Sequence, residues 1–369
     1  MPRYYLYIIL ILSALILTCC TEDEPTGSGP NQIPSLYDVE RFEFQSKTFL
    51  KVESNAYGFV IIFELTDEMA NHTFEASVEI FPSILKDEEG GHWNIFGECI
   101  SGPFEGQRLK ATNATYAYWF TWINLFENYW FNGEIKMNNP IPVDDPSWNI
   151  STDYVNEGAI FDAIPSIDDP QFETLSFKEC LENYNFLSEN DLVIVASLNG
   201  ETKVYPIKIL DHHEIVNDLL GGEPIVVSYA PYTGSPAVHL GNYKNEEYTF
   251  GVSGQVYMNN MLLFDRQTFS FWSQLLNRVV TGELLGAELQ PVSFVQLKWG
   301  TWKNAADNYT ILSEDQGFEK DYRTPKFDNY IANDSFIPFD VPVADDSQLN
   351  KSLFYGLSIA NEVRLYQEP

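Results

Sequence analysis

The chain has 369 residues, of which 44% are hydrophobic and 15% aromatic, so it can bury one or more sizeable cores. Disorder requires low hydrophobicity together with high charge, and the composition does not predict it. Aspartate and glutamate number 53 against 21 lysines and arginines, giving a net charge of −32. Because no basic stripe compensates for this charge, the surface repels phosphates, and we exclude nucleic acid as a partner.

Residues 1–20 have the pattern of a bacterial lipoprotein signal peptide. Arg3 precedes an apolar stretch at 4–17, which is shorter than the roughly 20 residues of a membrane span but suits a signal-peptide core. Lipid attachment needs a cysteine thiol at the first mature position. We favour Cys20 as the lipidated residue, with Cys19 as the alternative. An ordinary secretory signal cleaved nearby is the competing interpretation.

The next segment, 21–35, reads as a flexible acidic tether. Glycine, proline and serine fill most of 25–30, a composition that does not fold alone. The acidic triplet at 22–24 resembles the export signal that sends lipoproteins of Bacteroidetes-type bacteria to the outer face of the outer membrane. We therefore expect an outer-membrane lipoprotein facing the periplasm or the cell surface.

Two cysteines, Cys99 and Cys180, remain in the body of the chain. Export makes a disulfide between them permissible, but their separation in sequence does not establish one. Two buried thiols are the alternative, and both interpretations stay open at the level of sequence.

The chain carries internal repeats. A Thr-Phe-x-x-Ser pattern at 73–77 recurs at 249–253, and residues 192–205 resemble 353–366. Five further positions recur 180 residues later, namely Gly102, Gly106, Leu109, Trp119 and Trp122 as Gly282, Gly286, Leu289, Trp299 and Trp302. This pattern predicts a duplicated module. We expect a β-rich degenerate repeat domain at 36–140, a linker near 138–145, a core domain at 151–330 and a C-terminal partial repeat at 331–369 that packs on the core.

Local patterns favour strands. Residues 191–205 predict a hairpin because Asn199-Gly200 supplies the positive φ angles of a type I′ turn. The apolar run at 224–229 suits a buried strand. A short helix is predicted over 207–220, ended by Gly221-Gly222, and another near 299–307. The fold class is therefore β-dominated, either all-β or α+β with few short helices.

Several segments in the second half follow one another in an order typical of one family. They are 163–168, 213–218, 250–254, 260–268 and 272–274. Together these closely resemble the bacterial family catalogued as domain of unknown function 3179, over somewhat more than half of the chain. The resemblance implies an exported domain whose role is unassigned, and it carries no activity with it.

The chain departs from that family in one loop. Where members typically show Cys-Pro-x-Cys-Gly-Ser, residues 230–235 read Ala-Pro-Tyr-Thr-Gly-Ser. A thiol pair beside a histidine could bind a soft metal or cycle between dithiol and disulfide. Because Ala230 and Thr233 replace both thiols, we expect any such chemistry to be absent here.

His213, Glu214 and Asp218 are the candidate catalytic residues, and His213 is also the candidate metal ligand. On the predicted helix His213 shares a face with Asn217, and Glu214 with Asp218, facing the loop at 230–235. The alternative is a structural histidine bonded to a loop carbonyl. The sequence has neither a His-Glu-x-x-His pattern nor a serine-hydrolase elbow.

Other polar residues form a candidate ligand-binding set, namely Thr233, Ser235, Ser253, Asp265, Arg266 and Gln267. Arg266 could clamp a planar acid, but an Asp-Arg pair at a strand end is also typical of a turn with a fixed ion pair. The paired tryptophans suit core packing, with a carbohydrate platform as the alternative.

The leading hypothesis is an exported, lipid-anchored, non-catalytic module that binds a small ligand, an ion or a surface partner near His213. An exported metal-dependent or redox enzyme using the same pocket is the first alternative, and a structural cell-surface module is the second. The sequence indicates no cofactor. The partner that it predicts is the membrane, which the lipid anchor would enter.

Overall fold

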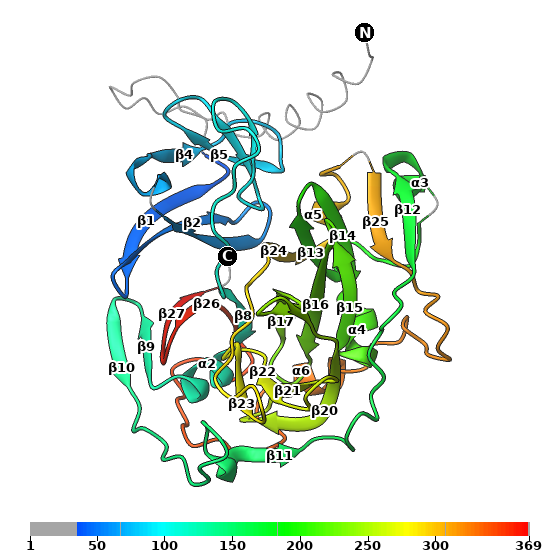
Figure 1. Ribbon diagram of the computed structural model, residues 1–369. Coiled ribbons are helices and arrows are strands. Elements are labelled where there is room, and N and C mark those ends of the chain that lie inside the picture. The colour runs from blue at the N-terminus through cyan, green and yellow to red at the C-terminus, as the bar shows by residue number, and fades with distance from the viewer. Residues whose placement is uncertain (1–34, 67, 183, 307, 368–369) are drawn as a thin grey trace, which may run out of the picture. The chain divides into compact units, whose positions relative to one another are not determined.

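The computed structural model describes residues 35–66, 68–182, 184–306 and 308–367. The predicted signal peptide, both candidate lipidation cysteines and the tether up to residue 34 lie outside the described residues. Strands account for 43% and helices for 10%, which confirms a β-dominated fold with short helices. Six sheets follow one another in a ring like that of a six-bladed β-propeller (Figure 1). No helix among the described residues has both the length and the apolar character needed to cross a membrane.

Three sheets take most of their strands from the first part of the chain. The first contains β1 (Asp38–Phe44), β2 (Lys47–Ser54) and β3 (Phe59–Leu65). The second contains β4 (Phe74–Ala76), β5 (Ser83–Asp87), β6 (His92–Asn94) and β7 (Cys99–Ser101). The third has the order β10 (Glu134–Met137), β9 (Asn128–Phe131), β27 (Glu362–Gln367), β26 (Leu353–Ile359) and β8 (Thr115–Tyr118).

Three further sheets come from the second part. One contains β15 (Ile215–Leu220), β16 (Glu223–Ala230) and β17 (Ser235–Leu240). The next contains β11 (Val155–Glu157), β20 (Phe250–Tyr257), β21 (Asn260–Asp265), β22 (Phe271–Ser273) and β23 (Arg278–Thr281). The last has the order β12 (Phe172–Ser176), β25 (Asn308–Leu312), β14 (Glu201–Pro206), β13 (Leu192–Leu198) and β24 (Phe294–Lys298).

The remaining elements are short. β18 (Asn242–Tyr243) pairs with β19 (Glu246–Glu247). Within the described ranges the α-helices are α2 (Trp119–Leu125), α3 (Phe177–Glu182), α4 (Ile207–His213), α5 (Trp299–Trp302) and α6 (Asp328–Ala332). Two 3₁₀ turns are η1 (Met69–Asn71) and η2 (Thr152–Tyr154). The predicted hairpin is confirmed as β13–β14 with positive φ at Asn199 and Gly200, and the strand predicted at 224–229 lies inside β16.

The sheets of the two parts correspond in order, which confirms the internal repeat. The two five-stranded sheets β10-β9-β27-β26-β8 and β12-β25-β14-β13-β24 match strand for strand, and each contains one parallel pair, β27 with β9 and β14 with β25. In each copy a short helix that starts at a repeated tryptophan follows the edge strand, α2 after β8 and α5 after β24. All four repeated tryptophans are buried, as core packing requires.

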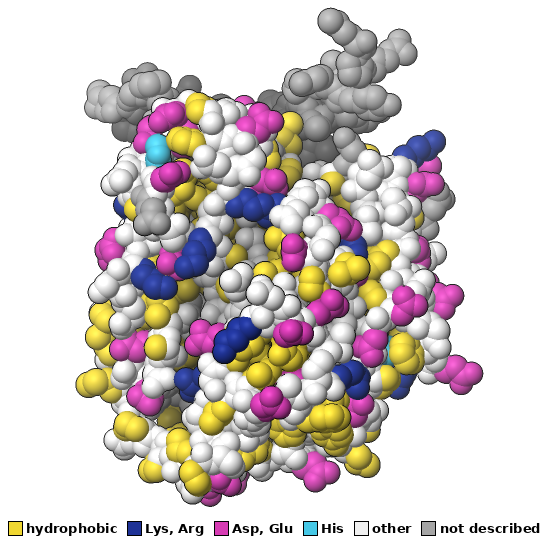
Figure 2. Space-filling view, in the orientation of Figure 1, with side chains coloured by type: hydrophobic (Ala, Val, Ile, Leu, Met, Phe, Trp, Pro, Cys, Tyr) yellow, Lys and Arg dark blue, Asp and Glu magenta, His cyan; other side chains and the backbone are white. Residues whose placement is uncertain are grey.

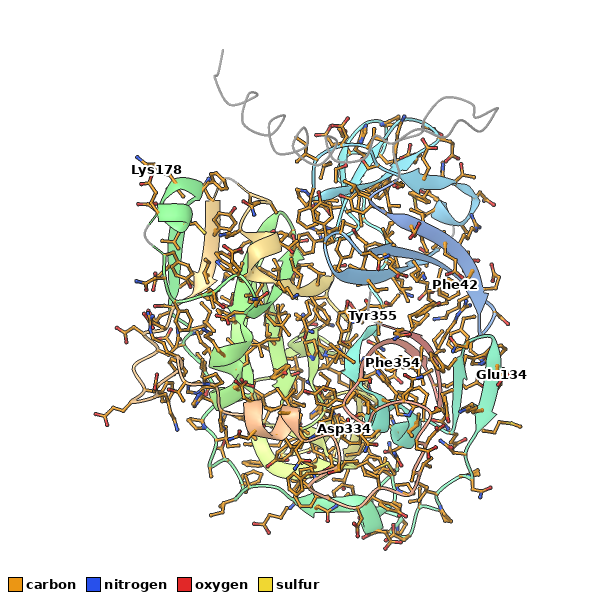
Figure 3. The ribbon with its side chains drawn as sticks, turned by 180° about the vertical axis from the view of Figure 1, so that it is seen from behind. Phe42, Glu134, Lys178, Asp334, Phe354 and Tyr355 are labelled. Carbon is orange, nitrogen blue, oxygen red and sulfur yellow. The ribbon has the colours of Figure 1, made fainter. Side chains whose placement is uncertain are left out.

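The C-terminal segment completes a sheet that the first part begins. β26 pairs with β8 and β27 pairs with β9, so that residues about 240 positions apart in sequence become neighbours. Side chains of β26 alternate between two buried surroundings. Phe354 lies 5.0 Å from the ring of Trp119, and Tyr355 lies 4.8 Å from the ring of Tyr116 (Figure 3).

An aspartate–tryptophan hydrogen bond fixes the same turn in both copies. Asp87 accepts from the indole N–H of Trp93 at 2.8 Å, and Asp265 accepts from that of Trp272 at 2.8 Å. Each carboxylate also accepts backbone N–H groups of its own turn, at Gly91 in one copy and Thr268 in the other. Both aspartates are buried, so these bonds supply the hydrogen bonding that water would otherwise provide.

One predicted helix is wrong in its second half. The helix predicted over 207–220 ends at His213, where Glu214 takes a left-handed conformation with φ of 60°, and strand β15 follows. Gly221-Gly222 forms the turn of the β15–β16 hairpin instead of ending a helix. The β-branched pair Ile215-Val216 fits the sheet, and pairing with β16 outweighs the weak helical pattern.

The two body cysteines are free and buried. Cys99 lies in β7 and Cys180 in α3. Burial raises the pKa of each thiol above its usual range. The structure therefore decides for two separate thiols, the alternative that the sequence left open beside a disulfide.

The repeated aspartates give a test of the duplication. We expect Asp87→Ala and Asp265→Ala each to lower the free energy of unfolding by roughly 2–3 kcal/mol, because each leaves buried donors unpaired. Since the two sites lie in different sheets, the losses should add in the double variant. Chemical denaturation measures all three, with the exposed Asp340→Ala as the control. A loss at only one aspartate would show that the two turns are not equivalent.

Candidate functional site

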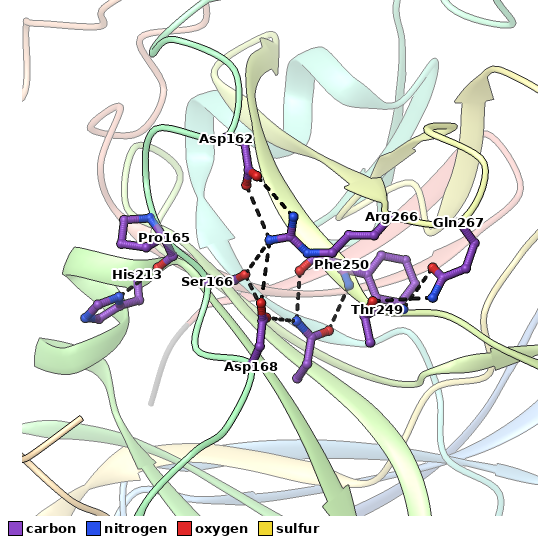
Figure 4. A network of polar contacts seen from close by, with 10 residues as sticks. Asp162, Pro165, Ser166, Asp168, His213, Thr249, Phe250, Arg266 and Gln267 are labelled. Atoms are coloured by element: carbon purple, nitrogen blue, oxygen red, sulfur yellow. Dashed lines mark hydrogen bonds and ion pairs between the residues drawn. The ribbon is translucent and has the colours of Figure 1, made fainter. Parts of the chain in front are cut away.

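His213, the last residue of α4, is fully buried and has both ring nitrogens occupied. Nδ1 lies 2.7 Å from the carbonyl oxygen of Pro165 (Figure 4). Nε2 lies 2.6 Å from the hydroxyl of Tyr322. A carbonyl can only accept, so Nδ1 carries the proton and Nε2 accepts from the tyrosine. Burial lowers the pKa of His213 and keeps the ring neutral. A histidine bonded to a loop carbonyl is the structural alternative to a catalytic His213.

Arg266 is surrounded by acidic partners. Its guanidinium donates to Asp162 at 3.0 Å and to the Ser166 hydroxyl at 3.0 Å, and it lies 3.6 Å from a carboxylate oxygen of Asp168 (Figure 4). Asn217 joins this network by donating to Asp168 at 2.6 Å. The carboxylates of Asp162 and Asp168 therefore neutralise the charge of Arg266. Such a fixed ion pair is the alternative to a clamp for an acidic ligand.

Asp265 and Gln267 hold backbone turns. Asp265 binds Thr268 and Trp272 as described above. The side-chain oxygen of Gln267 accepts the backbone N–H of Thr249 at 3.1 Å, and its side-chain nitrogen donates to the Thr249 hydroxyl at 3.4 Å. Asp265 thus connects the end of β21 to β22, and Gln267 connects the turn after β21 to Thr249, the residue before β20.

Thr233 and Ser235 belong to a buried polar network beneath the loop at 230–235. Their hydroxyls lie 2.8 Å apart. Asn260 donates to both, at 3.0 and 3.2 Å, and Ser235 donates to Gln274 at 2.9 Å. Neither hydroxyl residue exposes surface. The network fixes the shape of this loop at the position where the family resemblance places the second cysteine.

Ser253 and Asp218 are likewise bound within the fold. The Ser253 hydroxyl donates to the carbonyl of Leu262 across a bulge in β20. Asp218 pairs with the ammonium of Lys203 at 3.0 Å and accepts from the hydroxyl of Tyr205 at 2.7 Å. Because Asp218 lies on β15 instead of a helix, it does not share a helix face with Glu214, contrary to our prediction.

Glu214 is the predicted residue that lines a pocket. A pocket of about 270 Å³, here called the Glu214 pocket, opens beside the loop at 230–235. Its charged lining residues are Glu214 and Lys326. The rest of the wall is mainly apolar and includes Ile164, Ala230, Pro231, Tyr232, Val252, Val256, Met261 and Phe327. The volume lies just below the roughly 300–1,000 Å³ of most ligand pockets, and a mainly apolar wall with a few polar groups is typical of a small-molecule site.

The backbone holds Glu214 firmly at the pocket wall. Its N–H donates to the carbonyl of Leu210 at 2.7 Å, and its carbonyl accepts from the N–H of Tyr229 at 2.8 Å. These bonds maintain a left-handed φ that is costly for a residue other than glycine. A strained, well-anchored acidic residue beside a pocket is a reasonable starting point for a functional hypothesis.

Two carboxyl groups near the pocket have raised pKa values. Burial raises the pKa of Glu214 to about 7, with Lys326 opposing the rise and Asp211 adding to it. Burial also raises the pKa of Asp211 to about 7, again opposed by Lys326 and assisted by Asp328. Among the described residues no side-chain or backbone donor binds either carboxylate. Both groups therefore titrate near neutral pH, where a ligand could select one protonation state.

Sequence reasoning did not find several residues of this site, namely Asp211, Tyr232, Lys326 and Phe327. Asp211 precedes Glu214 by three positions, a spacing that would have suggested a pair on one helical turn. Lys326 reaches the site from a segment more than 100 residues away and donates to the carbonyl of Asp211 at 2.9 Å. In the described ranges no three histidine, cysteine, aspartate or glutamate side chains are grouped to hold a metal ion.

Comparison with known protein families identifies one that matches this chain. The family described as "Protein of unknown function (DUF3179)" matches residues 161–369, more than half of the chain. This chain belongs to the DUF3179 family. The DUF3179 region contains every candidate residue discussed above except those at the N-terminus. No curated protein and no solved structure matches the chain.

The raised pKa of Glu214 predicts a pH dependence of stability. In the folded protein Glu214 holds its proton up to about pH 7, whereas an unfolded glutamate loses it near 4.5, so wild-type stability falls between these values as pH rises. Glu214→Gln removes the part of this decline that Glu214 contributes, on the order of 3 kcal/mol, and leaves the part that Asp211 contributes. Denaturation from pH 4 to 8 measures it, with exposed Glu319→Gln as the control. Parallel curves for wild type and Glu214→Gln would contradict the assignment.

Proposed function

We propose that the protein is an exported, lipid-anchored, non-catalytic binding module of the bacterial envelope that takes a small, largely apolar ligand in the Glu214 pocket. One observation carries the proposal: an apolar pocket of about 270 Å³ has in its wall a carboxyl group that titrates near pH 7 and has no bonded partner among the described residues. Such a group is available to a ligand, whereas the other candidate side chains are occupied.

The same geometry favours binding over catalysis. General base catalysis by His213 requires a free ring nitrogen directed at the substrate, and both of its ring nitrogens are bound to Pro165 and Tyr322. The hydroxyls of Thr233, Ser235 and Ser253 are likewise committed to buried partners. Glu214 can instead accept a donor of the ligand when ionised or donate to the ligand when protonated.

Attachment to the outer membrane rests on the N-terminal sequence. The short apolar stretch, the paired cysteines and the acidic triplet at 22–24 support lipid attachment at Cys20 and display on the periplasmic or outer face. A lipid anchor at the N-terminus would leave the folded body free in solution beside the membrane.

Metabolic labelling with a radioactive fatty acid tests the anchor. We expect label in the wild-type protein and in Cys99→Ala, and loss of label in Cys20→Ala. Label lost in Cys19→Ala and kept in Cys20→Ala would move the attachment to the other cysteine. A wild-type protein that takes up no label would reject the lipid anchor.

Ligand binding is tested with N-phenyl-1-naphthylamine, an uncharged apolar fluorophore whose emission rises when it leaves water. We expect saturable binding to the full chain, weakened about tenfold or more by Ala159→Trp, because the indole fills the pocket. Ala332→Trp adds the same side chain to the exposed surface of α6 and serves as the matched control. Equal binding by wild type and Ala159→Trp would refute binding in the Glu214 pocket.

A further inference from the structure

Arg278, the first residue of β23, lacks the partner that other arginines have. No carboxylate and no carbonyl in the described part of the chain binds its guanidinium, and its Nε is buried without an acceptor. The remaining described arginines bind carboxylates or backbone carbonyls, namely Arg41, Arg108, Arg266, Arg323 and Arg364. A half-buried, unpaired guanidinium is unexpected in a chain with 53 acidic residues.

This arginine lines a hollow of about 320 Å³, here called the Arg278 hollow. The hollow shares no lining residue with the Glu214 pocket. Its wall offers apolar side chains at Leu125, Ile141, Val143, Ile150 and Leu276. The carboxylate in its wall, Glu127, accepts from the amide of Asn361 at 3.2 Å and does not pair with Arg278.

A second donor faces the same space. Tyr257, at the end of β20, lines the hollow, and no hydrogen bond among the described residues occupies its hydroxyl. The charge of Arg278 acts on this hydroxyl, since it opposes the rise in the pKa of Tyr257 to about 12 that burial causes. The guanidinium and the phenol thus provide two donors in one hollow, whose wall combines amide side chains with apolar ones.

We propose that the Arg278 hollow binds a small organic acid with an apolar body. The carboxylate of the acid lies against the planar guanidinium, which can donate two parallel N–H bonds to it, and the Tyr257 hydroxyl donates a third. The apolar body contacts the leucine, isoleucine and valine side chains of the wall.

The negative charge of the rest of the molecule bears on how the Arg278 hollow would distinguish an acid from its neutral analogue. Acidic side chains are scattered over the face drawn in Figure 2, and basic ones are fewer. This field repels anions at long range, so attraction to a carboxylate must come from local donors. Removing the charge of Arg278 should therefore remove the preference for the acid over its neutral analogue.

The probe is 4-fluorophenylacetate, followed by ¹⁹F NMR with the full chain, and 4-fluorophenylacetamide is its uncharged match. We expect saturable binding of the acid, about tenfold or more tighter than that of the amide, and loss of this difference in Arg278→Gln. Tyr257→Phe should weaken the acid less. Arg323→Gln removes the same charge from an exposed ion pair and should change nothing.

Cooperative thermal unfolding followed by circular dichroism reports whether Arg278→Gln is folded, and Arg278→Lys, which keeps the charge, provides a second variant. The proposal is overturned if the wild-type protein binds acid and amide equally or binds neither. It is also overturned if folded Arg278→Gln retains the preference for the acid.

Discussion

The fold depends on the C-terminal strands β26 and β27 entering a sheet whose other strands come from residues 115–137. Without them, β8 and β9 would be separate edges with unpaired backbone groups, and Phe354 would leave a gap beside Trp119. The insertion satisfies the backbone donors and acceptors of two open edges and closes the ring of sheets. The C-terminal strands are thereby held in the same hydrogen-bonded sheet as residues 115–137.

The duplicated architecture extends to the loops, but the two copies differ in chemistry. The β2–β3 and β16–β17 turns have the same length, and each ends in a glycine with positive φ, Gly58 and Gly234. Gly234 must remain glycine for a further reason, because a Cβ there would lie 2.7 Å from the ring of Tyr118. The second copy surrounds its turn with Glu214, Asp211 and Lys326 and so acquires a pocket with titrating groups.

Buried polar groups are used in two distinct ways. The polar groups of His213 and Thr233 meet nearby partners, and the terminal nitrogens of Arg266 bind Asp162 and Ser166, although its Nε has no acceptor among the described residues. These networks fix loop shape and contribute to a unique packing. Glu214 and Arg278 are opposite in sign, have no such partners among the described residues, and line separate hollows. An unpartnered charged group near a cavity costs stability, a cost that a bound ligand of opposite character can offset.

The sequence by itself determined the β-dominated class, the duplication and the family. The repeated glycines and tryptophans mark turns and core positions, which depend on the conformational and burial preferences of single residues. Asn199-Gly200 alone specifies its hairpin turn. Tertiary structure decided the rest. Residues 215–220 became a strand because β16 pairs with them, and both ring nitrogens of His213 are occupied because Pro165 and Tyr322 reach them. Lys326 and Arg278 gained their surroundings through contacts between distant segments, which no local pattern encodes.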